Sequence, residues 1–135
     1  MIELNASSLK RLEGVHPDLI AVVKHAAGLS DLLFVVTEGL RTIDRQKQLV
    51  AEGKSQTMKS RHLTGHAVDL AVWFDRDADK VVDVDELSWK FEFYKTLADT
   101  MKAAAQELGV VIEWGGDWKS LVDGPHFQLT WKDYP

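Results

Sequence analysis

The chain has 135 residues, 45% of them apolar and 27% charged, which suits a single globular domain over residues 1–135 and is too short for two domains. The formal net charge is −5 and Lys and Arg do not cluster, which argues against a nucleic-acid-binding groove. The chain has no cysteine, so disulfides are excluded and any metal must be held by His, Asp or Glu.

The N-terminal segment carries no sign of a targeting signal. Residues 1–10 lack a basic stretch followed by an apolar run, so we predict no signal peptide. The longest apolar stretches, such as residues 32–36, are far too short to span a membrane, and we predict no membrane insertion. We expect a monomer that is made in the cytoplasm; if it acts outside the cell, another component must let it out.

In the first half of the chain, apolar residues recur at helical spacing and are interrupted by one β-branched run. Pro17 is placed to begin a helix, and Gly28 and Gly53 are placed to end two of them. The expected elements are a short helix from residue 7 or 8 to 12, a helix over 17–28, a strand over 33–37, a helix over 44–52 and a polar surface loop over 53–61.

The second half mixes strands with the longest helical pattern. Asp69 interrupts a strand-like apolar run, and Gly109 is placed to end the long helix. The expected elements are a strand over 67–74, a turn over 75–80, a short strand over 81–84, a helix over 87–108 and strands over 110–114 and 127–131. Helices and strands do not alternate as regular βαβ units, so we predict an α+β fold with helices on an antiparallel sheet.

A histidine and an aspartate seven residues apart mark the segment richest in chemistry. Asp69 lies inside an apolar run, where a carboxylate is costly unless it is paired or coordinates a cation. His62 supplies a nitrogen, and zinc accepts both imidazole nitrogen and carboxylate oxygen. Gly65 allows the turn that brings the two side chains to one point. The pair therefore indicates part of a metal site.

His126 and Asp123 lie together at the start of the last expected strand. His126 is the candidate third ligand, and three protein ligands leave a fourth position for water, as in catalytic zinc sites. Asp123, across a Gly-Pro turn, is the candidate general base that takes a proton from that water. Most histidines are surface or satisfied core residues, and spacing alone does not decide between that interpretation and a metal site.

Residues 60–70, SRHLTGHAVDL, resemble the Ser-x-His-x-x-Gly-x-Ala-x-Asp signature of peptidoglycan metallopeptidases that cut D-Ala-D-Ala or L-Ala-D-Glu bonds. Two further segments are similar to this family in the same order, residues 38–42 with Gln46, and residues 114–118 followed by the His126 loop. The likeness runs from about residue 9 to residue 130. In particular, the chain resembles single-domain phage endolysins with L-alanyl-D-glutamate endopeptidase activity.

The resemblance implies a Hedgehog/D,D-peptidase-like fold with zinc (Zn²⁺) held by His62, Asp69 and His126. Asp123 matches the general base of the endolysin branch, whereas related D,D-dipeptidases more typically place a glutamate there. Arg41 matches an arginine thought to stabilise the developing oxyanion or to anchor the substrate. A guanidinium suits that role because it stays charged and donates in a fork.

Other residues in the matching segments are candidates for a supporting or substrate-contacting role. Gln46 is one of them, and Ser60 either hydrogen-bonds a site residue or is an ordinary loop serine. Trp114 and Trp118 either line the cleft or pack in the core and at its rim. Asp117 either orients a zinc-bound histidine or caps the glycine-rich turn.

An acidic stretch after the Asp69 strand indicates a second possible cation site. Five carboxylates occupy positions 1, 3, 5, 9 and 12 of a twelve-residue calcium loop: Asp75, Asp77, Asp79, Asp83 and Glu86. Against calcium (Ca²⁺), Lys80 stands where such a loop needs glycine for its sharp turn, and no helix is expected before it. A calcium site and a solvated acidic turn are therefore both open interpretations.

The residues and the resemblance together predict a zinc peptidase of phage lysis that hydrolyses the L-Ala-D-Glu bond in the stem peptide of peptidoglycan. One alternative is the same chemistry at another bond, in a D-alanyl-D-alanine carboxypeptidase or dipeptidase. The other is a non-catalytic, zinc-stabilised binding module of the same fold. The presence of Asp123 and Arg41 argues against the module, because neither residue is needed to hold the metal.

Overall fold

The computed structural model describes residues 2–55, 58–79 and 81–135; residues 56–57 of the predicted 53–61 loop lie outside this part. The α-helices are α1 (Ala6–Arg11), α2 (Pro17–Leu29), α3 (Ile43–Ala51) and α4 (Phe91–Leu108). The strands are β1 (Phe34–Glu38), β2 (Ala67–Trp73), β3 (Leu87–Ser88), β4 (Ile112–Trp114) and β5 (His126–Leu129). Short 3₁₀ helices cover Arg61–Thr64, Val84–Glu86 and Gly115–Asp117.

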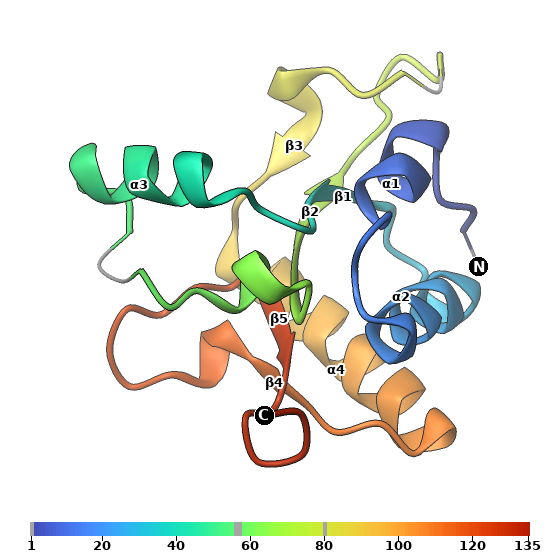
Figure 1. Ribbon diagram of the computed structural model, residues 1–135. Coiled ribbons are helices and arrows are strands. Elements are labelled where there is room, and N and C mark those ends of the chain that lie inside the picture. The colour runs from blue at the N-terminus through green and yellow to red at the C-terminus, as the bar shows by residue number, and fades with distance from the viewer. Residues whose placement is uncertain (1, 56–57, 80) are drawn as a thin grey trace.

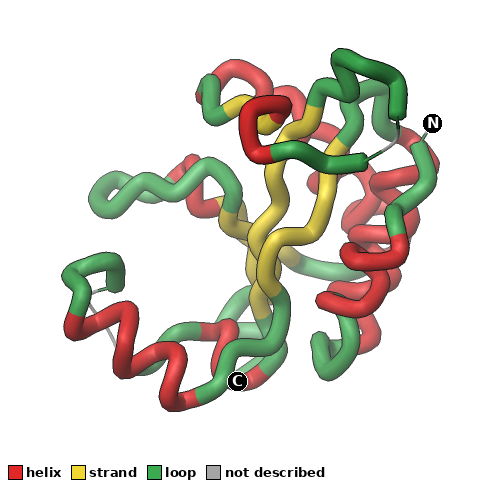
Figure 2. The backbone as a smooth tube through the Cα atoms, turned by 90° about the horizontal axis from the view of Figure 1, so that it is seen from above, coloured by secondary structure: helices red, strands yellow, loops and turns green. Residues whose placement is uncertain are grey.

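The strands form an antiparallel sheet that carries a helical layer on one face (Figure 1). The strand order is β1-β2-β5-β4, and β3 pairs with β2. Helices α2 and α4 pack together against this face, whereas α3 lies on the other side of the sheet (Figure 2). Within the described residues, no helix is both long and apolar enough to cross a bilayer. The predicted α+β fold is confirmed.

Strand β2 explains why one face of the sheet is apolar and the other can hold a polar site. Successive side chains of a strand point to opposite faces. Val68, Leu70 and Val72 are fully buried in the main core with α2 and α4. Asp69, between them, therefore points to the other face, where it is half-buried. The aspartate that interrupts the apolar run lies on the side of the sheet left open by the main helical layer.

A β-bulge at the end of β1 brings Glu38 to the same face as Asp69. The register pairs Val36 with Leu70 but Glu38 with Asp69, so Thr37 is an extra residue in β1. Residues directly opposite each other in a sheet point to the same face. Without the bulge, alternation would turn Glu38 toward the main core. The bulge therefore adds a second carboxylate beside Asp69.

Two of the predicted boundaries around β3 were wrong. The strand predicted over 81–84 is not formed; the strand that returns to β2 is Leu87–Ser88 instead. The long helix predicted from residue 87 begins at Phe91. Leu87 packs against a small apolar cluster around Trp73 and is the register partner of Trp73 in the sheet. This tertiary contact overrides the helical spacing of the sequence.

Gly65 ends the 3₁₀ helix that carries His62, and its conformation and packing both require glycine. Its φ of 73° is left-handed, and a Cβ added there would overlap the carbonyl oxygen of Gly14. We expect Gly65→Ala to lower the free energy of unfolding by about 2 kcal/mol or more, because backbone strain and steric overlap act together. Chemical denaturation measures the loss.

Gly109→Ala is the matched control for this prediction. Gly109 ends α4 with a φ of 69°, and nothing lies within 4 Å of an added Cβ. This variant therefore carries the backbone strain without the overlap and is expected to lose about 1 kcal/mol. Equal losses in the two variants would contradict the close packing of Gly65 on Gly14.

Candidate active site

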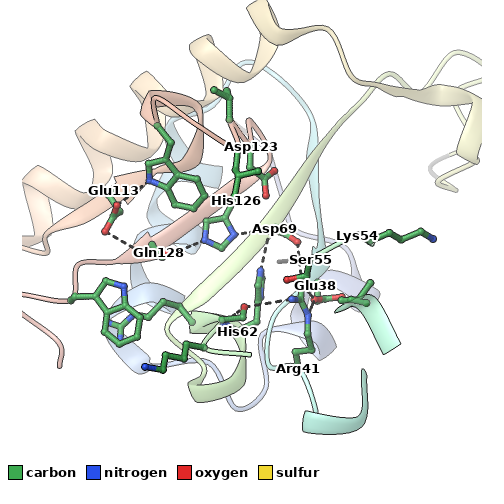
Figure 3. Close-up of a pocket in the computed structure, with 18 of the residues that line it drawn as sticks. Glu38, Arg41, Lys54, Ser55, His62, Asp69, Glu113, Asp123, His126 and Gln128 are labelled. Carbon is green, nitrogen blue, oxygen red and sulfur yellow. Dashed lines mark hydrogen bonds and ion pairs between the residues drawn. The ribbon is translucent and has the colours of Figure 1, made fainter. Parts of the chain in front are cut away.

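A cleft of about 990 Å³ opens on the sheet face opposite α2 and α4. One wall comes from the segments on either side of α3 and from the 3₁₀ helix Arg61–Thr64, and the other from β4, β5 and their connection. Its polar lining includes Glu38, Arg41, Ser60, His62, Asp69, Glu113, Asp123, His126 and Gln128, most of which are labelled in Figure 3.

The structure brings three of the predicted site residues together in this cleft. Asp69 of β2 is the register partner of His126 of β5, and His62 comes from the 3₁₀ helix. Oδ1 of Asp69 lies 3.2 Å from Nε2 of His62 and 3.2 Å from Nδ1 of His126. Figure 3 shows both imidazoles directed at this carboxylate. The three side chains offer ligand atoms that all lie within 4.8 Å of one another.

The spacing and hydrogen bonds of these groups fit a tetrahedral cation. Ligand atoms about 2.0–2.1 Å from zinc at tetrahedral angles lie roughly 3.3 Å apart, close to the observed 3.2 Å. Nδ1 of His62 lies 2.8 Å from the carbonyl oxygen of Gly39, an acceptor, so Nε2 is left with its lone pair for a metal. Nε2 of His126 lies 2.7 Å from Oε1 of Gln128, which leaves Nδ1 for the same metal.

The same contacts shift the protonation of the cluster. Burial tends to raise the pKa of Asp69, but hydrogen bonds to His126 and His62 outweigh it and hold this pKa well below its usual range. Burial tends to lower the pKa of His126, but the hydrogen bond to Asp69 and the charge of Asp69 outweigh it and raise this pKa. A cation that binds here therefore competes with a proton on His126, and its affinity falls with falling pH.

Asp123 is held in the cleft beside this cluster by its backbone. Its N–H donates to the carbonyl oxygen of Gly115 at 3.0 Å, and its own carbonyl oxygen accepts from the N–H of His126 at 3.2 Å. A Cβ on Gly115 would overlap the Asp123 carbonyl, so glycine permits this packing. Burial, followed by the negative charge of Asp69, raises the pKa of the Asp123 carboxyl. A carboxyl in such surroundings is suited to proton transfer.

Arg41 is fixed at the other side of the cluster by several partners. Its guanidinium pairs with Glu38, donates to Oε1 of Gln46 at 2.6 Å and lies 3.5 Å from Oγ of Ser60. Its Nη2 is 3.9 Å from Oδ2 of Asp69. Gln46 is fully buried. The structure therefore places Gln46 and Ser60 as supports of the arginine, and the arginine at the edge of the ligand cluster.

The glycine-rich turn after β4 places its predicted residues in three different surroundings. Trp114 is buried in the main core and donates its indole N–H to a backbone carbonyl, so it does not line the cleft. Trp118 does line it, with its ring centroid 5.1 Å from that of His126. Asp117 has an exposed side chain that pairs with Lys102 at 2.7 Å. Among the described residues its carboxylate accepts from Lys102 and not from a histidine, so the structure gives no support to the role of orienting a zinc-bound histidine.

Sequence reasoning assigns no role to three residues that line the cleft, Glu38, Glu113 and Gln128. Gln128 follows His126 by two positions in β5, and Glu113 of β4 is its register partner. Strand alternation therefore puts His126, Gln128 and Glu113 on one face of the sheet, and the two-residue spacing of His126 and Gln128 in a predicted strand already indicates this for that pair. Glu38 gives no such signal, because the bulge sets its direction.

The acidic stretch after β2 folds into a turn that gathers four of the five predicted carboxylates. Their ligand atoms lie within 4.8 Å of one another: Asp75, Asp77, Asp79 and Glu86. Asp83 is not in this group, although its backbone N–H donates to Oε1 of Glu86 at 3.3 Å. Lys80 lies outside the described residues. Four of the five carboxylates predicted as calcium ligands therefore lie close together in the structure.

The chain is similar in sequence to proteins named L-alanyl-D-glutamate peptidases. A family model described as phage L-alanyl-D-glutamate peptidase matches residues 1–130. The L-alanyl-D-glutamate peptidase of Escherichia phage T5 is 31% identical over 92% of this chain and 95% of its own length. The peptidoglycan L-alanyl-D-glutamate endopeptidase CwlK of Bacillus subtilis is 28% identical over 79% of this chain and 66% of its own length.

A solved structure agrees with these sequence matches. The crystal structure of the Serratia marcescens L-Ala D-Glu endopeptidase ChiX superposes with a TM-score of 0.85 and 46% sequence identity, covering 98% of this chain and 94% of that one. The sequence matches and the fold agree on one family of peptidases, and the cleft residues are consistent with it. The chain belongs to the phage L-alanyl-D-glutamate peptidase family.

Proposed function

We propose that this protein is a zinc-dependent endopeptidase that hydrolyses the L-Ala-D-Glu bond of the peptidoglycan stem peptide during lysis of a phage host. The observation that carries the proposal is the convergence of His62, Asp69 and His126 in an open cleft. The family supplies the bond, since its relatives are L-alanyl-D-glutamate peptidases. The protein acts on the cell wall after release, as a monomer.

The donor set favours zinc. Two imidazole nitrogens and one carboxylate oxygen would hold zinc with three protein ligands, the number typical of catalytic zinc sites. When bound there, zinc supplies Lewis acidity toward a peptide carbonyl and toward water. The second nitrogens of His62 and His126 are hydrogen-bonded to Gly39 and Gln128, which would orient both rings to hold the metal.

Asp123 and Arg41 carry the proton and charge chemistry of the proposal. The Asp123 carboxylate takes a proton from the attacking water and returns it to the leaving amine of D-Glu. Its raised pKa, caused by burial and by the charge of Asp69, suits both halves of this transfer. Arg41, held by Glu38 and Gln46, presents a guanidinium that stabilises negative charge developing on the carbonyl oxygen or anchors a substrate carboxylate.

Products from purified peptidoglycan test the proposal. The protein is incubated with peptidoglycan, and the soluble and residual peptides are identified by mass spectrometry. We expect new amino termini at D-Glu and L-Ala left on the sugar-linked side. Release of terminal D-Ala would instead indicate a D-alanyl-D-alanine carboxypeptidase or dipeptidase, and no new termini would indicate a binding module.

We also propose that the acidic turn binds calcium, one of the two interpretations that the sequence leaves open. We expect calorimetric titration with Ca²⁺ to give one binding event, because carboxylate oxygens are the ligands that calcium prefers and four of them already lie together. Asp77→Ala removes one of these ligands and is expected to weaken the event about tenfold or more. Asp83→Ala is the matched control: this carboxylate lies outside the group, so we expect its removal to weaken calcium binding less than Asp77→Ala does. No heat of binding in the wild type would contradict the prediction.

A further inference from the structure

The hydrogen bonds behind His126 form a chain that ends in a carboxylate (Figure 3). Nε2 of His126 lies 2.7 Å from Oε1 of Gln128, and Nε2 of Gln128 donates to Oε1 of Glu113 at 3.1 Å. The indole N–H of Trp118 donates to Oε2 of Glu113 at 3.1 Å. The Trp118 ring also packs 5.1 Å from the His126 ring. Gln128, Glu113 and Trp118 are therefore linked to one another by hydrogen bonds, and Gln128 and Trp118 both contact the His126 ring.

The two histidines of the cluster depend on acceptors of different kinds. His62 bonds to the backbone carbonyl of Gly39, an oxygen that can only accept. His126 bonds to the side-chain amide of Gln128, which can present either its oxygen or its NH₂ group. With the NH₂ group toward His126, Nε2 would have to accept, and the proton would move to Nδ1. That tautomer has no lone pair for a cation beside Asp69.

Glu113 fixes which of the two orientations the side-chain amide of Gln128 adopts. An ionised carboxylate only accepts, so the end of Gln128 that meets Glu113 must be its NH₂ group. The oxygen of Gln128 is then turned toward His126. Gln128 is 6% exposed, so water has little access with which to satisfy a reversed amide.

We propose that Glu113 is a positioning residue of the metal centre, which fixes the amide of Gln128 and through it the His126 tautomer with Nδ1 available to the cation. The inference rests on the proposed function, since it needs a metal at His62, Asp69 and His126. It assigns to Glu113 and Gln128 a role in metal affinity in addition to their place in the cleft wall.

The first test measures the zinc dissociation constant by competition with a chromophoric chelator. We expect Glu113→Ala to bind zinc about 10–100-fold more weakly than the wild type, the size of effect typical for partners that orient a metal ligand. Glu113→Gln is expected to fall between them, because its amide accepts but also donates. Glu107→Gln is the control, since Glu107 pairs with His25 outside the cleft.

A rescue variant separates orientation from mere packing. In the double variant Glu113→Ala/Gln128→Glu, the carboxylate at position 128 can only accept from His126 and needs no partner to orient it. We expect it to recover most of the zinc affinity lost in Glu113→Ala. Nitrogen NMR of the zinc-loaded wild type is expected to show Nδ1 of His126 bound to the metal and Nε2 protonated, with faster exchange of that proton in Glu113→Ala.

Three results would reject the inference. Wild-type zinc affinity in Glu113→Ala would show that Glu113 orients nothing. Equal weakness in the double variant would assign the loss to packing. A protonated Nδ1 of His126 in the zinc-loaded wild type would show the tautomer opposite to the one proposed. If Glu113→Ala fails to fold, as circular dichroism shows, Glu113→Gln and the double variant decide the same question. A wild type that binds no zinc would instead reject the proposed function itself.

Discussion

Replacing Asp123 with Asn is expected to lower kcat on purified peptidoglycan by about 10²–10⁴-fold, the usual contribution of a general base, while zinc still binds. Asn keeps the size of the side chain but cannot take up the proton of the attacking water. The backbone hydrogen bonds of Asp123 to Gly115 and His126 do not involve its carboxyl, so the loop is expected to stay in place. Initial rates together with the zinc content of the purified variant measure the effect.

The pH profile gives this prediction a second readout. Burial and the charge of Asp69 raise the pKa of Asp123, and only its ionised form is a base. Wild-type activity should therefore fall as the pH drops through a value above that of an ordinary aspartate, about 3.9. The assay is run with enough zinc to keep the site filled. The residual activity of Asp123→Asn should lack this acid limb.

Asp117→Asn is the matched control for Asp123→Asn. It makes the same chemical change at an exposed carboxylate that pairs with Lys102 outside the cleft. We expect its activity and zinc content to equal those of the wild type. An Asp123→Asn protein that holds zinc and works at the wild-type rate would eliminate Asp123 as the base.

Asp69→Asn is expected to remove zinc binding and activity together. Oδ1 of Asp69 lies 3.2 Å from the ligand nitrogen of each histidine, so this one carboxylate joins the whole cluster. Loss of a direct ligand should weaken zinc by more than the 10–100-fold typical of an outer partner. Competition with a chelator measures the affinity, and peptidoglycan digestion the activity. Zinc affinity unchanged in this variant would place the metal elsewhere.

The stability of the metal-free protein should also depend on Asp69. Its lowered pKa contributes stability that is present above the unfolded value of about 3.9 and lost as the pH falls. The raised pKa of His126 contributes stability that is present below about 6.5 and lost as the pH rises through the folded value. Denaturation of metal-free protein should show a stability maximum between these limits that Asp69→Asn lacks.

The sequence predicts the part of the site that depends on residues close together in the chain. Asp69 stands out because a carboxylate inside an apolar strand needs a partner, and His62 lies a short turn before it. The strand that begins at His126 then pairs with β2 so that His126 faces Asp69. The resemblance added Arg41 and Gln46, and the structure brings these two into contact.

The part that the sequence does not predict depends on contacts between distant segments. A bulge in β1 turns Glu38 into the cleft, and nothing in the residues around it marks an extra residue there. Asp117 and Trp114 lie within a segment that matches the family. Asp117 nevertheless pairs with Lys102, and Trp114 is buried in the core. Leu87 continues a helical pattern but pairs with Trp73, because packing on the sheet outweighs a propensity that is weak by comparison.

Metal removal and return tests the central claim most directly. The protein is stripped with a chelator, elemental analysis confirms that it is metal-free, and peptidoglycan digestion is followed as zinc is added back. We expect no cleavage by the stripped protein, and recovery of D-Glu amino termini that is complete at one zinc per chain. Cleavage at the full rate by verified metal-free protein would contradict a zinc-dependent activity.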